Sequence, residues 1–133
     1  MEKIVEFKNV SKVYKIGDNE FKALDNIDLS LNKGEMIVIL GPSGAGKSTL
    51  LNLIGGMDIP TNGSVMIDGE NISKYNENKL SDYRAENVGF IFQFYNILPS
   101  LTVKENVDIV KDIVKNRCKY RWSIKGGRII RAF

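Results

Sequence analysis

An α/β fold with an attached antiparallel β layer is predicted by the hydrophobic pattern and by one glycine-rich turn. Residues 3–10 and 21–31 alternate polar and apolar side chains, which is typical of strands that bury one face. Residues 36–40 (MIVIL) are continuously apolar, which predicts a strand buried on both faces. The glycine-rich turn then joins this run to a short apolar helix. Alternating strands beside a strand–loop–helix unit indicate an α/β core with an antiparallel layer.

The other strands and the polar helix follow from turn residues and side-chain patterns. Residues 14–20 (YKIGDNE) predict a turn-rich loop between the first two strands. Residues 64–69 (SVMIDG) predict a further strand, and residues 77–87 a polar surface helix. Residues 88–92 (VGFIF) predict a second continuous apolar strand.

Both apolar helices carry signals at their ends. Gly55 and Gly56 end the helix that follows the glycine-rich turn. Thr102 and Glu105 have the spacing of a capping box, which predicts a helix that starts there. The side chains expected along one face of this second helix are Val103, Val107, Val110 and Val114.

The bulk properties favour a cytoplasmic protein. A chain of 133 residues suits one domain or part of one. The longest aliphatic run, residues 36–40, is far below the roughly 18 residues of a membrane-spanning helix, so direct membrane insertion is not expected. The N-terminus lacks the apolar block of a secretion signal. The one cysteine, Cys118, cannot form an internal disulfide, which fits a reducing compartment.

Charge is distributed unevenly along the chain. Residues 1–112 carry 12 Lys and Arg against 16 Asp and Glu, a net charge of −4. Residues 113–133 carry seven cations and no acid, a net charge of +7. Two explanations compete: a basic arm for phosphate-rich partners, or a segment that does not belong to the design of the first 112 residues.

The glycine-rich turn has the chemistry of a phosphate cradle. Gly41, Gly46, Lys47 and Ser48 match G-x-x-x-x-G-K-[ST], between a predicted buried strand and a predicted helix. Glycine at these positions and at Gly44 lets the backbone curl, so that successive N–H groups point into one concavity. The positive end of the following helix faces the same place. The motif therefore predicts binding of a nucleoside triphosphate, against the alternative of an ordinary glycine-rich turn.

Each cradle residue has an expected role. Lys47 can reach the β- and γ-phosphates as a point charge, the Ser48 hydroxyl can ligate Mg²⁺, and Thr49 can contact the α-phosphate. The predicted cofactor-binding residues of the loop are Gly41, Pro42, Ser43, Gly44, Ala45, Gly46, Lys47, Ser48 and Thr49.

Two other short motifs have simpler interpretations. Residues 32–35 (NKGE) resemble a guanine-reading motif, but they precede the cradle and end in Glu35, so a strand-connecting turn is the better interpretation. Asp68 ends an apolar stretch, as a magnesium carboxylate would. However, Asp68 with Gly69 is a common turn dipeptide, and a turn is expected.

At this point the sequence resembles the ATP-binding subunits of ABC transporters. The run VSKVYKIGDNEFKALDNIDLSLNKGEMIVILGPSGAGKSTLLNLIGGMDIPTNGSVMIDGENI follows the family pattern, and so does YRAENVGFIFQFYNILPSLTVKENV. These motifs are most similar to those of the branch associated with lipoprotein release, macrolide export and antimicrobial-peptide efflux. The resemblance runs from the N-terminus to about residue 115. It implies the ABC ATPase fold, a P-loop NTPase core with an attached antiparallel β layer, here C-terminally incomplete.

The resemblance also implies roles for residues outside the loop. Tyr14 stands where the family places an aromatic side chain that stacks on adenine. Gln93 stands where the family uses a glutamine to contact Mg²⁺ and the attacking water, so it is a predicted catalytic and metal residue together with Lys47 and Ser48. Residues 94–98 would touch the transmembrane permease. Without the family, Tyr14 would be a core or edge residue and Gln93 a solvated amide.

Several family features are missing from the 133 residues. The chain has no histidine, no carboxylate beyond Asp112 and no serine-glycine-glycine signature; Lys125 stands in the serine position of SIKGGRIIRAF. We therefore expect residues 1–115 to be the N-terminal part of the ABC domain. Residues 116–133 would be a basic tail from a frameshift or truncation, with a genuine basic arm as the rival. The absent strands would flank residues 36–40 and 88–92, leaving their apolar faces exposed.

The predicted function is that of an ATP-binding subunit that binds ATP and Mg²⁺ to power export or extraction by a membrane permease. By resemblance the protein is an ABC-type ATPase, cytoplasmic and peripheral at the inner face of the cell membrane, and a homodimer in its full-length form. The 133-residue chain itself is expected to lack efficient turnover. Two alternatives stay open: a non-catalytic ATP-binding or docking module, and a P-loop protein with a nucleic-acid-binding tail, although nucleic acid is not the expected partner.

Overall fold

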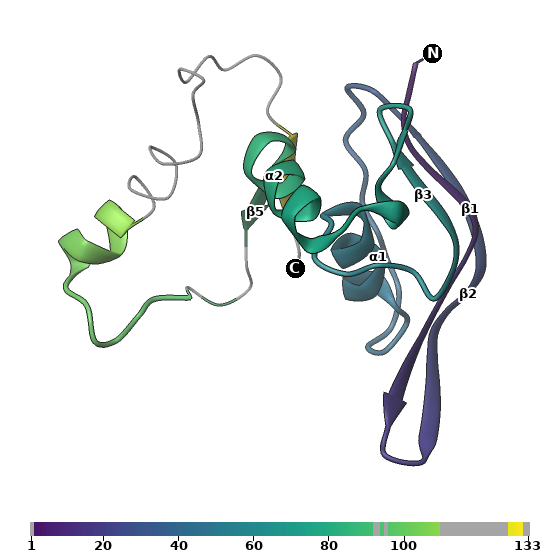
Figure 1. Ribbon diagram of the computed structural model, residues 1–133, viewed down its shortest axis with the longest axis horizontal. Coiled ribbons are helices and arrows are strands. Elements are labelled where there is room, and N and C mark those ends of the chain that lie inside the picture. The colour runs from purple at the N-terminus through teal and green to yellow at the C-terminus, as the bar shows by residue number, and fades with distance from the viewer. Residues whose placement is uncertain (1, 92–93, 95, 110–127, 132–133) are drawn as a thin grey trace. The chain divides into compact units, whose positions relative to one another are not determined.

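The computed structural model describes residues 2–91, 94, 96–109 and 128–131 and divides the chain into two compact units, Met1–Ser81 and Asp82–Phe133 (Figure 1). The first unit holds the antiparallel sheet and the glycine-rich loop. The second holds a parallel strand pair and a short helix. In the described part of the chain, no helix is long and apolar enough to cross a membrane.

The first unit is built on an antiparallel sheet with strand order β2-β1-β3-β4. Its strands are β1 (Lys3–Ile16), β2 (Asn19–Asn32), β3 (Asn62–Ile67) and the short β4 (Glu70–Asn71). The long strand β1 pairs with β2 along one edge and with β3 along the other. The strands predicted from alternating side chains are confirmed.

The hairpin between β1 and β2 is tighter than the sequence predicts. The turn-rich loop expected over residues 14–20 is wrong, because Tyr14 pairs with Phe21 and Ile16 pairs with Asn19. Only two residues separate the strands, and Gly17 supplies the positive φ of 62° that such a short turn requires. In Figure 1 the two strands extend as a long ribbon to this turn.

The core of the first unit lies between the sheet and helix α1 (Lys47–Ile54), which contacts β2 and β3 (Figure 1). Phe7 and Val65 lie opposite each other in the β1–β3 register and are both fully buried. On the helix, Leu53 is fully buried as well. The other buried apolar residues of this unit are Val5, Val10, Leu24, Ile54, Ile67, Ile72 and Leu80. The helix ends at Ile54, where the Gly55–Gly56 pair predicted its end.

Residues 36–40 do not form the predicted strand. They carry no strand assignment, and Met36, Val38 and Leu40 are 94%, 72% and 86% exposed. A continuous apolar run becomes a buried strand only when neighbouring strands pair with it and cover its faces. Among the described residues, no strand pairs with this run. The expected exposure of its apolar side chains is confirmed.

The remaining elements agree closely with the sequence patterns. Between β4 and α2 lies a 3₁₀ turn, η1 (Ile72–Lys74). Helix α2 (Glu77–Asn87), across which the boundary between the units falls, has the predicted limits. It is followed in the second unit by strand β5 (Val88–Ile91), which pairs in parallel with β6 (Arg128–Arg131). The expected exposure of an apolar face extends to β5, where Ile91 is 45% exposed.

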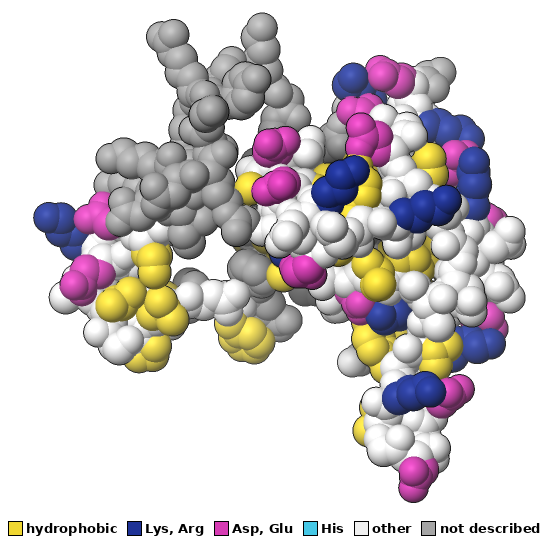
Figure 2. Space-filling model, in the orientation of Figure 1, with side chains coloured by type: hydrophobic (Ala, Val, Ile, Leu, Met, Phe, Trp, Pro, Cys, Tyr) yellow, Lys and Arg dark blue, Asp and Glu magenta, His cyan; other side chains and the backbone are white. Residues whose placement is uncertain are grey.

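A further helix of the second unit covers residues 103–109 and begins with the predicted capping box. The Thr102 N–H donates to the Glu105 carboxylate at 2.8 Å, and the Glu105 N–H donates to the Thr102 hydroxyl at 3.3 Å. Val103 and Val107, on the predicted apolar face, are 85% and 56% exposed. Val110 and Val114, the other members of that face, lie outside the described residues. In Figure 2 hydrophobic side chains gather over this helix and the chain before it.

Candidate functional site

The glycine-rich loop ends at the N-terminus of α1, and that terminus has no side-chain cap. The N-cap residue is Gly46, in the left-handed region at φ 82°. A turn inside the loop is closed by the Ala45 N–H, which donates to the Pro42 carbonyl at 3.2 Å. The first helical hydrogen bond runs from the Leu50 N–H to the Gly46 carbonyl at 2.8 Å. The amides of the first turn are therefore not used by a capping side chain, and the positive end of the helix is open to an anion.

Two glycines give the loop its shape. Gly44 and Gly46 have φ values of 81° and 82°, which only glycine adopts without strain. A Cβ atom on Gly46 would lie 2.5 Å from the Ala23 carbonyl oxygen and 2.9 Å from a Leu24 methyl group. A Cβ atom on Gly44 would meet nothing within 4 Å. The loop thus rests on β2 at Gly46 and is unobstructed at Gly44.

The Lys47 side chain turns back onto the loop. Its ammonium group donates to the carbonyl oxygens of Gly41 and Pro42, both at 2.7 Å. This holds a full positive charge against the loop, beside the positive end of α1. The predicted cradle residues are therefore together on one short segment, with a cation and a helix terminus that both favour negative charge.

The hydroxyl residues that follow Lys47 occupy the first turn of α1. Ser48 is exposed and Thr49 is partly buried. A hydroxyl oxygen is a ligand of the hard type that Mg²⁺ prefers. Within the described parts of the chain, no three His, Cys, Asp or Glu side chains gather as a metal site. The residues present fit a cation that takes one hydroxyl from the protein and its other ligands from phosphate and water.

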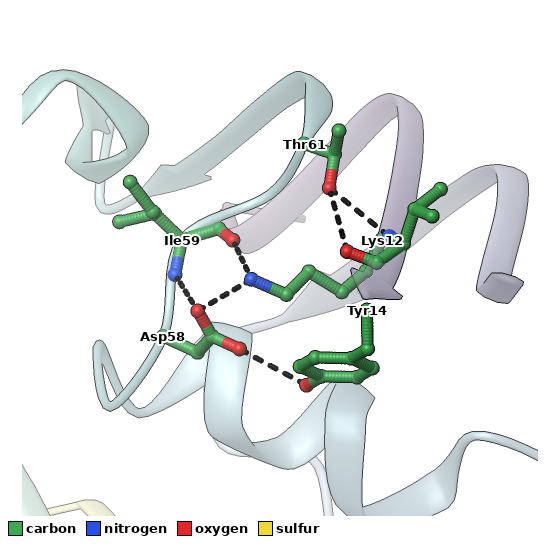
Figure 3. Close-up of polar contacts among 6 residues, drawn as sticks. Lys12, Tyr14, Asp58, Ile59 and Thr61 are labelled. Carbon is green, nitrogen blue, oxygen red and sulfur yellow. Dashed lines mark hydrogen bonds and ion pairs between the residues drawn. The ribbon is translucent and has the colours of Figure 1, made fainter. Parts of the chain in front are cut away.

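The second part of the site is a polar cluster around Tyr14, which we call the Tyr14 cluster and define as Lys12, Tyr14, Asp58, Ile59 and Thr61 (Figure 3). The Tyr14 hydroxyl donates to one Asp58 carboxylate oxygen at 3.0 Å. The Lys12 ammonium donates to the other oxygen at 2.6 Å and to the Ile59 carbonyl at 2.8 Å. It also lies over the Tyr14 ring, 5.0 Å from the ring centre.

Backbone contacts hold the loop that carries Asp58 against β1. The Thr61 N–H donates to the Ser11 carbonyl at 2.9 Å. The Thr61 hydroxyl accepts the Val13 N–H at 3.0 Å. Asp58 itself accepts the Ile59 N–H at 2.8 Å. This loop therefore continues the pairing of β1 beyond the first residue of β3.

Asp58 is ionised in this setting. Its partial burial raises the pKa of the carboxyl group, but hydrogen bonds from Lys12, from the Ile59 N–H and from Tyr14 outweigh that effect, so the pKa is held below its usual value. The side chains of Lys12 and Asp58 are only 12% and 26% exposed. The pair is more shielded from solvent than an ordinary surface ion pair, so its attraction is less screened.

The pairing of β1 with β2 brings together the segment that carries Tyr14 and the segment on which the cradle rests. Gly46 rests on Ala23 of β2, and the flanking residues Lys22 and Leu24 pair with Val13 and Lys12 of β1. A base-stacking ring and a phosphate cradle are expected to lie near each other in a nucleotide site. The register of the hairpin brings together the two segments that carry them.

Other predicted positions have mixed outcomes. Gln93, the predicted catalytic and metal residue, lies outside the described residues, and Phe94 beside it is 75% exposed. Asp68, with φ 52°, stands at the turn between Ile67 and Glu70, which pair, so the turn interpretation is confirmed. At the other look-alike motif, the Glu35 carboxylate accepts the backbone N–H of Asn32 at 2.9 Å and its side-chain amide at 2.8 Å, which confirms a turn.

Lys12 and Asp58 were not predicted as site residues. The two residues are 46 positions apart in the sequence. No local sequence pattern predicts a contact between residues so far apart in the sequence. Observed β1 extends to Ile16, so Lys12 and Tyr14 are two apart on one strand and their side chains share one face; the predicted strand, residues 3–10, ended before both.

Comparison with known proteins places the chain in a family. The sequence profile described as "ABC transporter" matches residues 24–130. The uncharacterised ABC transporter ATP-binding protein YknY of Bacillus subtilis is 44% identical over 106 residues, which are 80% of this chain and 46% of YknY. The macrolide export ATP-binding/permease protein MacB of Hyphomonas neptunium is 47% identical over 106 residues, 80% of this chain and 16% of MacB.

A solved structure agrees with these matches. The dimeric, post-hydrolysis structure of the ATP-binding cassette MJ0796, from Methanocaldococcus jannaschii, bound to ADP and Pi, is similar with a TM-score of 0.77 at 41% identity. The match covers 92% of this chain and 51% of that one, so the chain spans about half the length of such relatives. The predicted fold class is confirmed. The profile covers most of the 133 residues, and the chain belongs to the ABC transporter family, in its ATP-binding domain.

Proposed function

We propose that this chain binds Mg-ATP through residues 41–49 and that the whole protein uses ATP hydrolysis to drive a membrane permease. The observation that carries the proposal is the cradle: an uncapped helix N-terminus, left-handed Gly44 and Gly46, and the Lys47 ammonium held against the loop. Backbone donors and one fixed cation suit the dense negative charge of a triphosphate. Tyr14 would stack on the adenine ring.

Mg²⁺ would be held by the Ser48 hydroxyl and by phosphate oxygens, and Gln93 would contact the ion and the attacking water. When bound, the ion would neutralise charge that develops on the transferring phosphoryl group. Lys47 would neutralise part of the same charge through its contact with the β- and γ-phosphates. The chain's own backbone amides would orient the phosphates, and the rigid start of α1 would keep those donors in place.

The 133 residues alone would bind Mg-ATP without efficient turnover. They contain no histidine, no carboxylate beyond Asp112 and no serine-glycine-glycine signature. Hydrolysis needs a group that positions or activates water, and charge around the phosphoryl group beyond what Lys47 and Ser48 supply. In the whole protein, two subunits would associate head-to-tail around two ATP molecules.

The partner would be a permease that chooses the transported substrate, for export or extraction. The protein would therefore be cytoplasmic and peripheral at the inner face of the cell membrane. The exposed apolar side chains before and within the helix at 103–109 suit a surface that is covered by another protein. They are Phe94, Ile97, Leu98, Val103, Val107 and Ile109.

Residues 116–133 would be the product of a frameshift or a truncation, rather than part of the ABC design. The switch from a net charge of −4 to +7 supports this, and the profile match through residue 130 stands against it. Sequencing of the coding region decides the matter. A single-base correction that restores the absent motifs is the expected result, and an intact reading frame would refute it.

Calorimetric titration of the full chain with Mg-ATP tests the proposed function. We expect saturable binding that Lys47→Ala weakens at least tenfold, a loss of about 1.4 kcal/mol or more. Lys74→Ala is the matched control, because it removes the same charge from an exposed 3₁₀ position. Unchanged affinity in Lys47→Ala would refute the cradle assignment. Turnover at the rate of intact relatives would refute the proposed inactivity alone.

A further inference from the structure

We infer that Asp58 and Lys12 are positioning residues that hold the Tyr14 ring for stacking by a nucleobase, on the ring face opposite Lys12. This inference rests on the proposed binding of ATP and adds two residues and an orientation to that site. It follows from the geometry of the Tyr14 cluster: Asp58 accepts a hydrogen bond from the Tyr14 hydroxyl, Lys12 lies over the Tyr14 ring, and Lys12 and Asp58 form an ion pair (Figure 3).

The ring is held at both ends. Its Cβ is attached to β1, and its hydroxyl is hydrogen-bonded to Asp58 at 3.0 Å. A tyrosine has only two side-chain torsions, so two fixed ends leave the ring plane little freedom. Stacking of a base on an aromatic ring contributes to binding, and a ring that is already oriented loses less entropy on binding.

Lys12 decides which face of the ring is available. Its ammonium lies over one face, 5.0 Å from the centre, and the same group is fixed by Asp58 and by the Ile59 carbonyl. A base cannot stack on a face that an anchored cation already covers. We therefore place the nucleobase on the other face, where it would be the second layer on the ring.

Asp58 also connects the ring to the phosphate cradle. It lies in the loop that follows the C-terminal end of α1, the helix whose N-terminus carries Lys47. That loop is tied to the helix by the N–H groups of Met57 and Asp58, which donate to the Asn52 carbonyl at 2.9 and 3.3 Å. One short rigid element thus spans from the phosphate site to the anchor of the base-stacking ring.

Attachment of this loop to the sheet does not require the Tyr14 hydroxyl. Thr61 already holds the loop through backbone contacts with Ser11 and Val13. The ion pair between Lys12 and Asp58 uses one carboxylate oxygen, and the second is directed to Tyr14. The contact to the ring is therefore additional to the attachment of the loop, and it acts on the ring's orientation.

Calorimetric titrations of the full chain with Mg-ATP and with Mg-tripolyphosphate test the inference, since the second probe has phosphates and no base. Asp58→Asn and Tyr14→Phe are each expected to weaken Mg-ATP binding about three- to tenfold, the range of one ordinary hydrogen bond. Binding of tripolyphosphate should stay within about twofold. The double variant should bind Mg-ATP no more weakly than the single variant with the lower affinity, because both substitutions act on the same contact.

Lys12 has its own pair of variants. Lys12→Met should weaken Mg-ATP binding selectively, and Lys12→Arg should restore most of it, because a cation over the ring face is regained. Tyr14→Phe removes a single oxygen from a partly exposed side chain, so it keeps the test decisive if an Asp58 variant fails to fold.

The outcomes separate this inference from the proposed function. If the unaltered chain binds neither probe, the proposed function fails and this inference fails with it. If the chain binds both probes equally tightly, the cradle stands but the base adds nothing, which overturns the inference alone. Equal losses for both probes in Asp58→Asn, or unchanged Mg-ATP affinity in Tyr14→Phe, would also overturn it.

Discussion

The strands β1, β2 and β3 and the run at residues 36–40 were all predicted as strands with buried apolar side chains, but only the first three are strands of that kind. Phe7 and Val65, in the sheet, are 1% and 0% exposed, whereas Met36 and Leu40 are 94% and 86% exposed. Apolar character alone therefore does not make a strand. The difference lies in whether a partner strand is present in the described part of the chain.

Connection length explains why the sheet finds its partners. β1 and β2 are antiparallel and joined by a two-residue turn, so closing that loop costs little entropy. A strand of the parallel type needs neighbours that arrive through crossovers of a dozen residues or more. Such partners are distant in sequence, and the chain spans about half the length of YknY and of the MJ0796 cassette.

The largest expected effect separates the two regions directly. Phe7→Ala should lower the free energy of unfolding by about 3–5 kcal/mol, because it leaves a cavity in the core of the sheet. Val38→Ala, in the exposed run, should change it by less than about 0.5 kcal/mol. Urea unfolding followed by circular dichroism measures both. A large cost for Val38→Ala would mean that this run is packed in solution.

The junction between the regions is tested by the two left-handed glycines. Gly46→Ala should cost about 2–3 kcal/mol, because it combines backbone strain with a clash against Ala23 of β2. Gly44→Ala has the same φ and no neighbour, so its cost should be about 1–2 kcal/mol. Thermal unfolding of the two variants compares them. Equal costs would show that the loop does not rest on β2.

How much was predictable depends on the range of the interactions. The strands β1 to β3, helix α2 and the capping box at Thr102 and Glu105 rest on local patterns, and all were predicted. The residues of the cradle are adjacent in sequence, so the motif could be identified locally, and its role in phosphate binding stays a prediction. The run at residues 36–40 was predicted wrongly as a strand, because pairing depends on distant segments.

The Tyr14 cluster shows the same division within the site. Tyr14 was identified through a family resemblance, but its partners Lys12 and Asp58 were not. Their contact joins β1 to a loop 46 residues later and depends on how α1 packs on the sheet. Side-chain periodicity and turn residues predict local structure only, so this long-range contact could be found only in the folded structure.

A smaller effect is expected from the ion pair of this cluster. Lys12→Met should lower the free energy of unfolding by about 1 kcal/mol, because it leaves the largely shielded Asp58 carboxylate with fewer donors. Lys15→Met is the control. The Lys15 side chain is 80% exposed and its Nζ lies 3.7 Å from Glu20 Oε1, so almost no change in the free energy of unfolding is expected. Chemical denaturation of the two variants would contradict this account if their costs were equal.

The smallest effect is a pH dependence. The pKa of Asp58 is lower in the folded chain than its unfolded value of about 3.9. Its stabilising contribution is therefore complete above that value and is lost as the pH falls through the folded pKa. The stability difference between the unaltered chain and Asp58→Asn should be constant from about pH 5 to 8 and shrink below about pH 4. A difference that grows in acid would refute the assignment.

The central claim is that backbone amides at the start of α1 receive the phosphates of a nucleotide. Amide proton and nitrogen NMR shifts of the full chain, titrated with Mg-ATP, test it most directly. The largest shifts are expected at Gly44, Gly46, Lys47 and Ser48, with Mg-tripolyphosphate moving the same signals. If Mg-ATP binds while these amides stay unmoved, or if shifts concentrate on the basic residues 113–133, the phosphate cradle is not where we place it.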